Sequence, residues 1–535
     1  MDIHKTENEM KIVTCSAGTY RGRVSAEGVS SFLGIRYGQA PVGRLRWQPP
    51  RPVSGGGVVN DALEYGNPPI QRLNPGTWYS TAGRMILNKF GRQTEVPKKM
   101  DEDCLYLNIW TGDNGKKKKP VLVWIFGGAY IQGDSGSPEA CGERLAARYP
   151  ELVVVSINYR LGVLGSINLD SLDETGEFCY SKNLAILDQQ EALRWIHENI
   201  EAFGGDRENV TLCGHSAGSN AITHHLTSET SGRLFRRAIC QSSFLPGAGS
   251  TSLEDSRKIG DAFIRLSGAS SMEELLALPA ARLCELQQEL MRMAFPDIKS
   301  KLFSPVADGL VLPVDGYERL IKGAAADKEV LLGCSSGEMD SLLEGQSQLE
   351  MMRDVILKRC GVLESMETLR DVEKRMSSQA IPERTERECL MDVYNDINIR
   401  IPGLLMAKAL SKKGICYTYY CNWWYEEDNC RAYHGVINPL LFGGNMEELL
   451  PEKLCASLRE TWIHFIKNGN PNNEQIPKWE PYTELSPRTM IIDREWRLEE
   501  GWKSVDEEIL LPFFTEWEQL KGVETNAEDN NGGWI

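Results

Sequence analysis

Residues 210–218 constrain this chain more than any other part of its sequence. They run from a Val-Thr-Leu-Cys stretch into G-H-S-A-G, a G-x-S-x-G pattern centred on Ser216. The first residues predict a strand and the last a helix, with a turn between them too tight for a side chain at Gly214 or Gly218. Such a turn presents the serine hydroxyl at its tip and leaves the first N–H groups of the helix unpaired beside it. The segment therefore predicts a serine nucleophile.

Strand-like and helix-like segments alternate ahead of this turn. Continuous apolar runs at residues 121–125 and 152–157 predict buried parallel strands. Residues 183–203 carry apolar side chains at three- and four-residue steps, which predicts a helix that ends at Gly204. Strand, helix, strand, turn and helix in this order predict an α/β fold.

Ordered blocks along the chain make it resemble the type-B carboxylesterases, the group that contains the cholinesterases and the bacterial para-nitrobenzyl esterases. The resemblance implies the α/β-hydrolase fold, a mostly parallel central sheet with helices on both faces, and the hydrolysis of carboxylic esters. The matching blocks are residues 32–37, 102–110, 158–165, 188–189, 203–206, 214–218, 235–238 and 305–309.

In this fold the serine is followed along the chain by an acid and then by a histidine. Of the seven histidines, His434 follows a β-rich run and a loop, and residues 434–443 resemble the family's histidine block, which closes on an aromatic–glycine pair. We therefore expect His434 to be the catalytic base. The other histidines are interpreted as packing or surface residues: His4, His197, His215, His224, His225 and His464.

The resemblance places the acid at Glu338, five residues after Gly333 in a loop that follows a predicted strand. The chain departs from the family pattern here, because Gly337 and Met339 stand where relatives usually have Asp and Gly. Asp340 is the alternative acid.

The resemblance also assigns the oxyanion hole, whose N–H groups stabilise the negative oxygen of a tetrahedral intermediate. The donors would be Gly128, Ala129 and Ala217. Most relatives carry a third glycine at the position of Ala129, so we expect its methyl group on the acyl side of the pocket. Ser242 matches a family serine that hydrogen-bonds near the triad acid, and we expect a supporting role for it.

Composition limits the partners of the chain. Its 59 Lys and Arg against 75 Asp and Glu give a net charge of −16, which argues against nucleic-acid binding. The N-terminus lacks the apolar core of a signal peptide, and no cysteine lies between Cys15 and Cys104 to form the bridge that secreted cholinesterases make there. We expect a cytoplasmic protein with mostly reduced thiols, no metal or other cofactor, no membrane partner, and a monomeric or small homo-oligomeric state.

We expect one domain over residues 1–535, because no linker, repeat or low-complexity tract interrupts the body of the chain. Residues 60–100 and 245–300 are expected to form the walls or lid of a gorge that receives a small-molecule ester. Candidate lining residues are Trp78, Tyr79, Met85, Phe90, Met291, Met293 and Phe295.

Two other functions are compatible with these features. An amidase, a thioesterase or a toxin-degrading hydrolase could use the same triad on another bond. A non-catalytic cholinesterase-like binding module would keep the fold, but such proteins usually lose a triad member, whereas Ser216, Glu338 and His434 are all present here.

Overall fold

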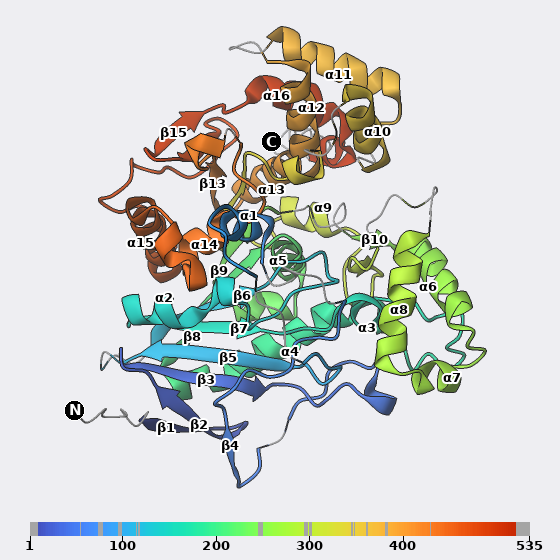
Figure 1. The fold of residues 1–535 in the computed structure, drawn as a ribbon, viewed down its shortest axis with the longest axis vertical. Helices are drawn as coiled ribbons and strands as arrows, with labels where there is room; N and C mark the ends of the chain where they lie inside the picture. Colours follow the sequence, from blue (N-terminus) through green and yellow to red (C-terminus); the bar gives the residue numbers. More distant parts are fainter. Residues whose placement is uncertain are drawn as a thin grey trace, which may run out of the picture.

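The computed structural model describes residues 9–520 except 54, 73–78, 95–98, 114, 116–117, 244, 246–249, 294–297, 299–301, 344–345, 347, 360–361, 380–383 and 429. A large twisted sheet runs through it with helices on both faces (Figure 1). The strands are β1 (Met10–Cys15), β2 (Gly18–Val24), β3 (Val29–Arg36), β4 (Val59–Asp61), β5 (Tyr106–Gly112), β6 (Lys119–Ile125), β7 (Val153–Ile157), β8 (Gly205–His215), β9 (Arg237–Gln241), β10 (Thr251–Ser252), β11 (Val306–Ala307), β12 (Glu329–Ser335), β13 (Ile415–Cys421), β14 (Arg488–Ile492) and β15 (Arg497–Glu500). The helices are α1 (Thr81–Lys89), α2 (Gly142–Arg148), α3 (Gly162–Gly165), α4 (Leu184–Asn199), α5 (Ala217–Thr227), α6 (Leu253–Ser267), α7 (Met272–Ala277), α8 (Ala280–Arg292), α9 (Gly316–Ile321), α10 (Leu349–Arg359), α11 (Met366–Gln379), α12 (Glu386–Asn395), α13 (Ile401–Ser411), α14 (Ile437–Phe442), α15 (Glu452–Asn468) and α16 (Ser504–Leu510).

The main sheet has 13 strands in the order β1-β2-β3-β5-β7-β6-β8-β9-β12-β13-β14-β15, with β4 beside β2. Every neighbouring pair from β7 to β14 is parallel, whereas β1–β2 and β14–β15 at the two edges are antiparallel. The prediction of a mostly parallel central sheet is confirmed. Because β8, β9, β12 and β13 are successive parallel neighbours, their carboxyl ends meet at one edge of the sheet.

The predicted elements around the serine turn are present. The two apolar runs form β6 and β7, and all five residues of β7 are buried. The predicted helix is α4 followed by a 3₁₀ turn, Ile200–Phe203, and Gly204 ends it with a φ of 86°. That left-handed conformation favours glycine, which explains why the helix ends there.

Buried polar contacts explain two of the sequence blocks that carry the family resemblance. The Arg160 guanidinium makes two hydrogen bonds of 2.8 and 2.6 Å to the carboxylate of Asp188 on α4. The neighbouring Tyr159 hydroxyl donates to the carbonyl of Phe126, at 2.6 Å, and its ring stacks on the Phe126 ring. The Tyr159 contacts hold the loop after β6, and the Arg160–Asp188 pair joins the segment after β7 to α4.

Two groups of helices lie outside the sheet layers (Figure 1). The first group is α6, α7 and α8, which pack beside α3 and form a separate hydrophobic cluster around Phe263 and Trp47. The second is α10, α11, α12 and α16, and α12 continues through a π-helical turn, Asp396–Arg400, into α13. α13 in turn packs on β12 and β13, so this group leads directly to the strand ends.

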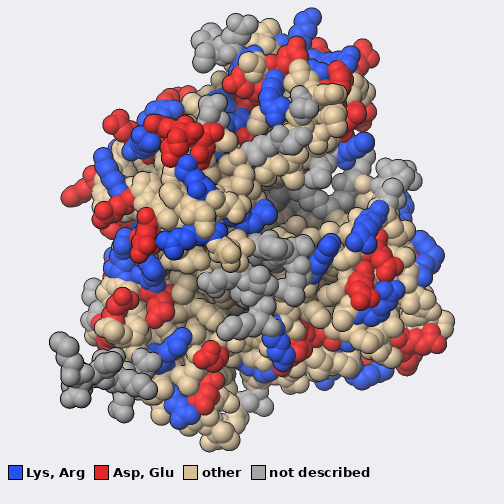
Figure 2. All heavy atoms as spheres, viewed as in Figure 1, with Lys and Arg blue, Asp and Glu red and all other residues tan. Residues whose placement is uncertain are grey.

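Charged side chains of both signs are interspersed over the face drawn in Figure 2, and no continuous basic patch is visible on its described part. Within the described residues, no helix is both long and apolar enough to cross a bilayer. The cysteines that the structure describes, Cys421 and Cys430 among them, are free thiols.

Candidate active site

The predicted serine turn joins β8 to α5. Ser216 has φ 56° and ψ −119°, a strained conformation for a residue with a side chain that costs about 1–3 kcal/mol. A Cβ at Gly214 would lie 2.6 Å from the carbonyl carbon of Gly218, across the turn as predicted. A Cβ at Gly218 would instead meet the Ile125 carbonyl oxygen of β6 at 2.0 Å. Gly218 is therefore required by the neighbouring strand rather than by the turn.

The loop after β6 passes beside this turn. A Cβ at Gly127 would lie 3.0 Å from the Cβ of Ser216, so only a glycine allows the two segments to approach so closely. Gly128 and Ala129 follow with φ values of 119° and 54°, and Ala129 is exposed. Ala217 is the first residue of α5, and its N–H has no acceptor within the helix. The three predicted donors thus lie on the two segments that meet at Ser216.

Glu338 and His434 are brought together from the ends of adjacent strands. Glu338 lies in the loop after β12 and His434 in the loop after β13, and His434 Nδ1 is hydrogen-bonded to Glu338 Oε2. The other carboxylate oxygen, Oε1, accepts from the Ser242 hydroxyl at 2.7 Å and from the Ser335 N–H at 2.6 Å. The predicted acid, base and supporting serine therefore form one hydrogen-bonded group.

The ionised form of Glu338 is favoured by these partners. Burial alone would raise the pKa of this carboxyl, whose side chain is 1 % exposed, but His434 and the hydrogen bonds from Ser335 and Ser242 together lower it. The His434 side chain is 16 % exposed, so it lies between the buried carboxylate and the open side of the site. A carboxylate in this position fixes the imidazole tautomer with Nδ1 protonated and leaves Nε2 as the basic nitrogen.

His215 makes a contact that the sequence did not indicate. It was interpreted as a packing residue because it flanks the serine, and it is indeed buried. Its ring, however, lies 4.3 Å from the ring of His434, centroid to centroid, at an angle of 49°. Burial, and then the proximity of His434, lower the pKa of His215 well below its usual range, and its Nε2 has no hydrogen-bond partner among the described residues. A second, neutral imidazole thus contacts the predicted base.

Asp340, the alternative acid, is hydrogen-bonded to residues other than His434. Its carboxylate accepts two hydrogen bonds from the guanidinium of Arg431, at 2.7 and 2.8 Å, and a third from Asn395 at 2.7 Å. These partners occupy the carboxylate, whereas Glu338 contacts the histidine. The geometry therefore favours Glu338 over Asp340 as the acid.

The other described histidines lie on helices: His197 on α4, His224 and His225 on α5, and His464 on α15. His225 on α5 is hydrogen-bonded to Ser231 and Gln189, and burial lowers its pKa to about 3. Burial lowers the pKa of His224, also on α5, to about 4. His464 lies on α15, which ends before Gly469 as predicted. His4 lies outside the described residues.

Comparisons with known proteins identify the family of the chain. The family model described as "Carboxylesterase family" matches residues 9–509. The chain belongs to the carboxylesterase family. It is 30% identical over 521 residues to the para-nitrobenzyl esterase of Bacillus subtilis (strain 168), covering 94% of this chain and 99% of that one. It is also 30% identical to carboxylesterase 1C of Rattus norvegicus, with 88% of both chains covered. A solved structure of a PNB esterase superposes with a TM-score of 0.78 at 29% identity, over 94% of this chain and all of that one.

The carboxylesterase is accordingly a carboxylic ester hydrolase with the α/β-hydrolase fold. Its α1 helix, within residues 60–100, is hydrogen-bonded to the backbone of the predicted base. The N–H of Ala82 donates to the carbonyl of His434 at 3.0 Å. Ser80, the N-cap of α1, donates from its N–H and its hydroxyl to the buried carboxylate of Glu139, at 2.6 and 2.5 Å. Burial raises the pKa of Glu139 to about 7, although the hydrogen bonds from Ser80 oppose the shift.

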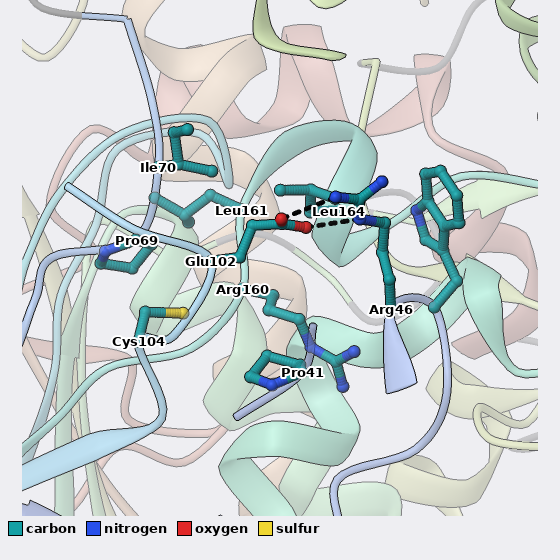
Figure 3. Close-up of a pocket in the computed structure, with 10 residues that line it drawn as sticks. Pro41, Arg46, Pro69, Ile70, Glu102, Cys104, Arg160, Leu161 and Leu164 are labelled. Atoms are coloured by element: carbon teal, nitrogen blue, oxygen red, sulfur yellow. Dashed lines mark hydrogen bonds and ion pairs between the residues drawn. The ribbon is translucent and has the colours of Figure 1, made fainter. Parts of the chain in front are cut away.

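A small cavity of the carboxylesterase is lined in part by two of the sequence blocks, residues 102–110 and 158–165 (Figure 3). Its volume is about 10 Å³, which is room for one water at most. Arg46 and Glu102 form a doubly hydrogen-bonded ion pair on its wall, at 2.5 and 2.7 Å. None of the candidate catalytic residues lines it, so we interpret the cavity as part of the structural core.

The candidate gorge-lining residues of the carboxylesterase differ in exposure. Tyr79 is buried, Met85 is half-buried, and Phe90, Met291 and Met293 are exposed to 43%, 39% and 40%. Phe90 packs on the Tyr425 ring at the far end of α1. Two further candidates, Trp78 and Phe295, lie outside the described residues.

Proposed function

We propose that this carboxylesterase cleaves small-molecule esters through an acyl-enzyme on Ser216, with His434 as base and Glu338 as the group that orients it. The observation that carries the proposal is the hydrogen bond between His434 and the buried Glu338 carboxylate. The His434 ring also contacts His215, the residue that directly precedes Ser216 on its strained turn. A serine hydroxyl needs such a base to become nucleophilic.

The proposed reaction has two steps. Ser216 Oγ attacks the ester carbonyl carbon while His434 Nε2 takes the hydroxyl proton. The N–H groups of Gly128, Ala129 and Ala217 stabilise the resulting oxyanion. His434 then gives the proton to the departing alcohol, which leaves the acyl group on the serine. Water attacks this acyl-enzyme with His434 again as base, and the acid product departs as Ser216 regains its proton.

The side chains and N–H groups named above carry out every proton transfer and stabilise the charge that develops, so the proposed reaction needs no metal or other cofactor. Ser242 supports the acid without touching the substrate. We propose that residues 60–100 and 245–300 are insertions within a single domain that wall the gorge. A cytoplasmic location and a monomeric or small homo-oligomeric state also remain proposals, which cell fractionation and light scattering would check.

The decisive experiment measures hydrolysis of para-nitrophenyl esters of rising acyl length by the wild type and by Ser216→Ala and Glu338→Gln. We expect Ser216→Ala to lower kcat by more than about 10³-fold and Glu338→Gln to lower it by about 10³–10⁴-fold. An organophosphate should add its mass to the peptide that contains Ser216, and to no other peptide. Full activity of Ser216→Ala would refute the proposal.

The same assay separates the alternatives. Matched amide and thioester substrates with the same acyl group should be cleaved more slowly than the ester. A preference for either would reassign the substrate class while leaving the triad in place. A folded wild type that neither turns over any substrate nor reacts with the organophosphate would instead support a non-catalytic binding module.

A further inference from the structure

The loops that carry Glu338 and His434 are joined by more than the hydrogen bond between those two residues. The Gly337 N–H donates to the Ala432 carbonyl at 2.8 Å, and the Ala432 N–H donates to the Ser336 hydroxyl at 3.1 Å. The first of these bonds extends the parallel pairing of β12 and β13 past the strand ends, where Gly337 also pairs with Tyr433. Beyond Glu338, a pair of side chains connects the two loops.

Asp340 and Arg431 make that connection. Arg431 Nε and Nη2 donate to the two carboxylate oxygens of Asp340, at 2.8 and 2.7 Å, in the paired geometry that makes an arginine–carboxylate contact directional. Asp340 lies two residues after Glu338, and Arg431 lies three residues before His434. The Asp340 side chain is 3 % exposed, so solvent does little to weaken the pair.

The pair is anchored to the helices on its other side. Asn395, the last residue of α12 before the π-helical turn, donates to Asp340 at 2.7 Å and accepts from the Met339 N–H at 2.6 Å. The third donor of Arg431, Nη1, reaches Asp392 on α12 at 2.5 Å. Burial alone would lower the pKa of Arg431, but Asp340 and then Asp392 raise it, so the guanidinium stays charged. π-Helical turns often occur next to functional sites, and this one begins directly after Asn395.

Gly337 makes room for the pair. A Cβ at this position would lie 2.8 Å from Asp340 Oδ2 and 3.0 Å from the Cβ of Arg431. The Asp340 carboxylate thus occupies the space next to residue 337. Gly337, one of the two departures from the family pattern in this loop, is therefore explained by the space that the Asp340–Arg431 pair needs.

We propose that the Asp340–Arg431 pair is a clasp that positions the Glu338 carboxylate against the His434 imidazole. Both members are positioning residues, since neither lies within the hydrogen-bonded group that would act on the ester. The inference rests on the proposed function, because it assigns Glu338 and His434 their roles.

The test compares Asp340→Asn with a matched control. Asparagine keeps the shape of the side chain and removes its charge. The control is Glu373→Gln, which alters a similarly buried pair on α10 and α11, where Arg353 bonds Glu373 at 2.9 and 2.6 Å. For both variants, kcat and KM are measured with para-nitrophenyl acetate, and kcat is expressed per active site titrated with an organophosphate. The thermal midpoint and the pH dependence of kcat/KM are measured as well.

We expect both variants to lose thermal stability, but only Asp340→Asn to lose catalysis. Its kcat per titrated site should fall by about 10- to 100-fold with KM within about twofold, because a displaced catalytic group costs rate rather than ground-state binding. The acid limb of its kcat/KM profile should move to lower pH, since a less well placed carboxylate stabilises the His434 imidazolium less. The control should keep its kcat within about twofold.

The proposal is refuted if Asp340→Asn keeps the wild-type kcat per titrated site and its pH profile keeps the acid limb of the wild type. If that variant fails to fold, Arg431→Lys is measured instead, because lysine keeps the positive charge but cannot donate the two paired hydrogen bonds of a guanidinium. A wild-type kcat and profile in Arg431→Lys would equally overturn it. Glu338→Gln is measured in parallel: full activity there would refute the proposed function itself, whereas full activity of the clasp variant alone would leave that function intact.

Discussion

The imidazole rings of His215 and His434 lie 4.3 Å apart, centroid to centroid. The first belongs to the residue that precedes the proposed nucleophile and the second to the proposed base. Gly435 permits this contact, since a Cβ there would lie 2.9 Å from the His215 ring and 2.4 Å from the Cβ of Ser80. Any charge placed at position 215 would therefore act directly on the protonation of His434.

We predict that His215→Glu moves the acid limb of kcat/KM upward by about one pH unit. A carboxylate at this distance would stabilise the His434 imidazolium, so a higher pH is needed to produce the neutral base. His215→Gln, which introduces no charge, should leave the limb where the wild type has it. The pH profiles of the three enzymes check this, and identical limbs in all of them would contradict it.

Glu139 should make the stability of the protein depend on pH. Its pKa is about 7 in the folded state against an ordinary value of 4.5, so its stabilising contribution is complete below pH 4.5 and is lost as the pH rises through 7. The shift corresponds to about 3 kcal/mol. Urea unfolding of Glu139→Gln should therefore show a cost relative to the wild type that is larger at pH 5 than at pH 8. Glu174→Gln, on an exposed turn, should show the pH dependence of the wild type. A cost for Glu139→Gln that does not change with pH would count against the prediction.

Ala129 should restrict bulky substrates. Its exposed methyl group lies in the loop that passes Ser216, on a residue with a positive φ that glycine adopts more easily. Ala129→Gly should therefore raise the turnover of a tert-butyl ester relative to an ethyl ester of the same acid. An unchanged ratio would show that the methyl group does not reach the substrate.

Gly218→Ala should destabilise the serine turn by about 1–3 kcal/mol or more, because the new methyl group would meet the Ile125 carbonyl oxygen of a central strand. The matched control is Gly232→Ala, where the nearest atom would be 3.5 Å away. Thermal unfolding and organophosphate titration of both variants check the prediction. Equal thermal midpoints would mean that β6 and α5 can separate at little cost.

Much of this structure could be predicted from the sequence, for reasons visible in particular residues. The G-H-S-A-G turn is a local device, so its strand, turn and helix could be inferred from nine consecutive residues. Glu338 was predicted from family spacing and His434 from its resemblance to the family's histidine block, and the structure places a hydrogen bond between them. The exact turn geometry was less accessible, since the need for Gly218 comes from β6, which is distant in the sequence.

The features that could not be predicted from the sequence are contacts between distant segments. Nothing in the sequence indicates that His215 would lie against a ring 219 positions away, or that Asp340 would be bonded by Arg431 rather than by the histidine. Glu139 likewise gave no signal, because its importance arises from burial beside Ser80. Such pairings depend on how the sheet brings loops together, and a single sequence carries no periodicity that reports them.

Strand β9 supplies no member of the proposed triad, yet it connects the nucleophile to the acid. The Ser216 amide donates to the Gln241 carbonyl at 2.9 Å, and the next residue, Ser242, donates from its amide to the Gly333 carbonyl and from its hydroxyl to Glu338. A fluctuation that frees the end of β9 would break all of these bonds at once. The amide protons of Ser216 and Ser242 should therefore exchange with deuterium in a single cooperative opening, slowly and at matched rates, although the two residues lie on different segments of the chain.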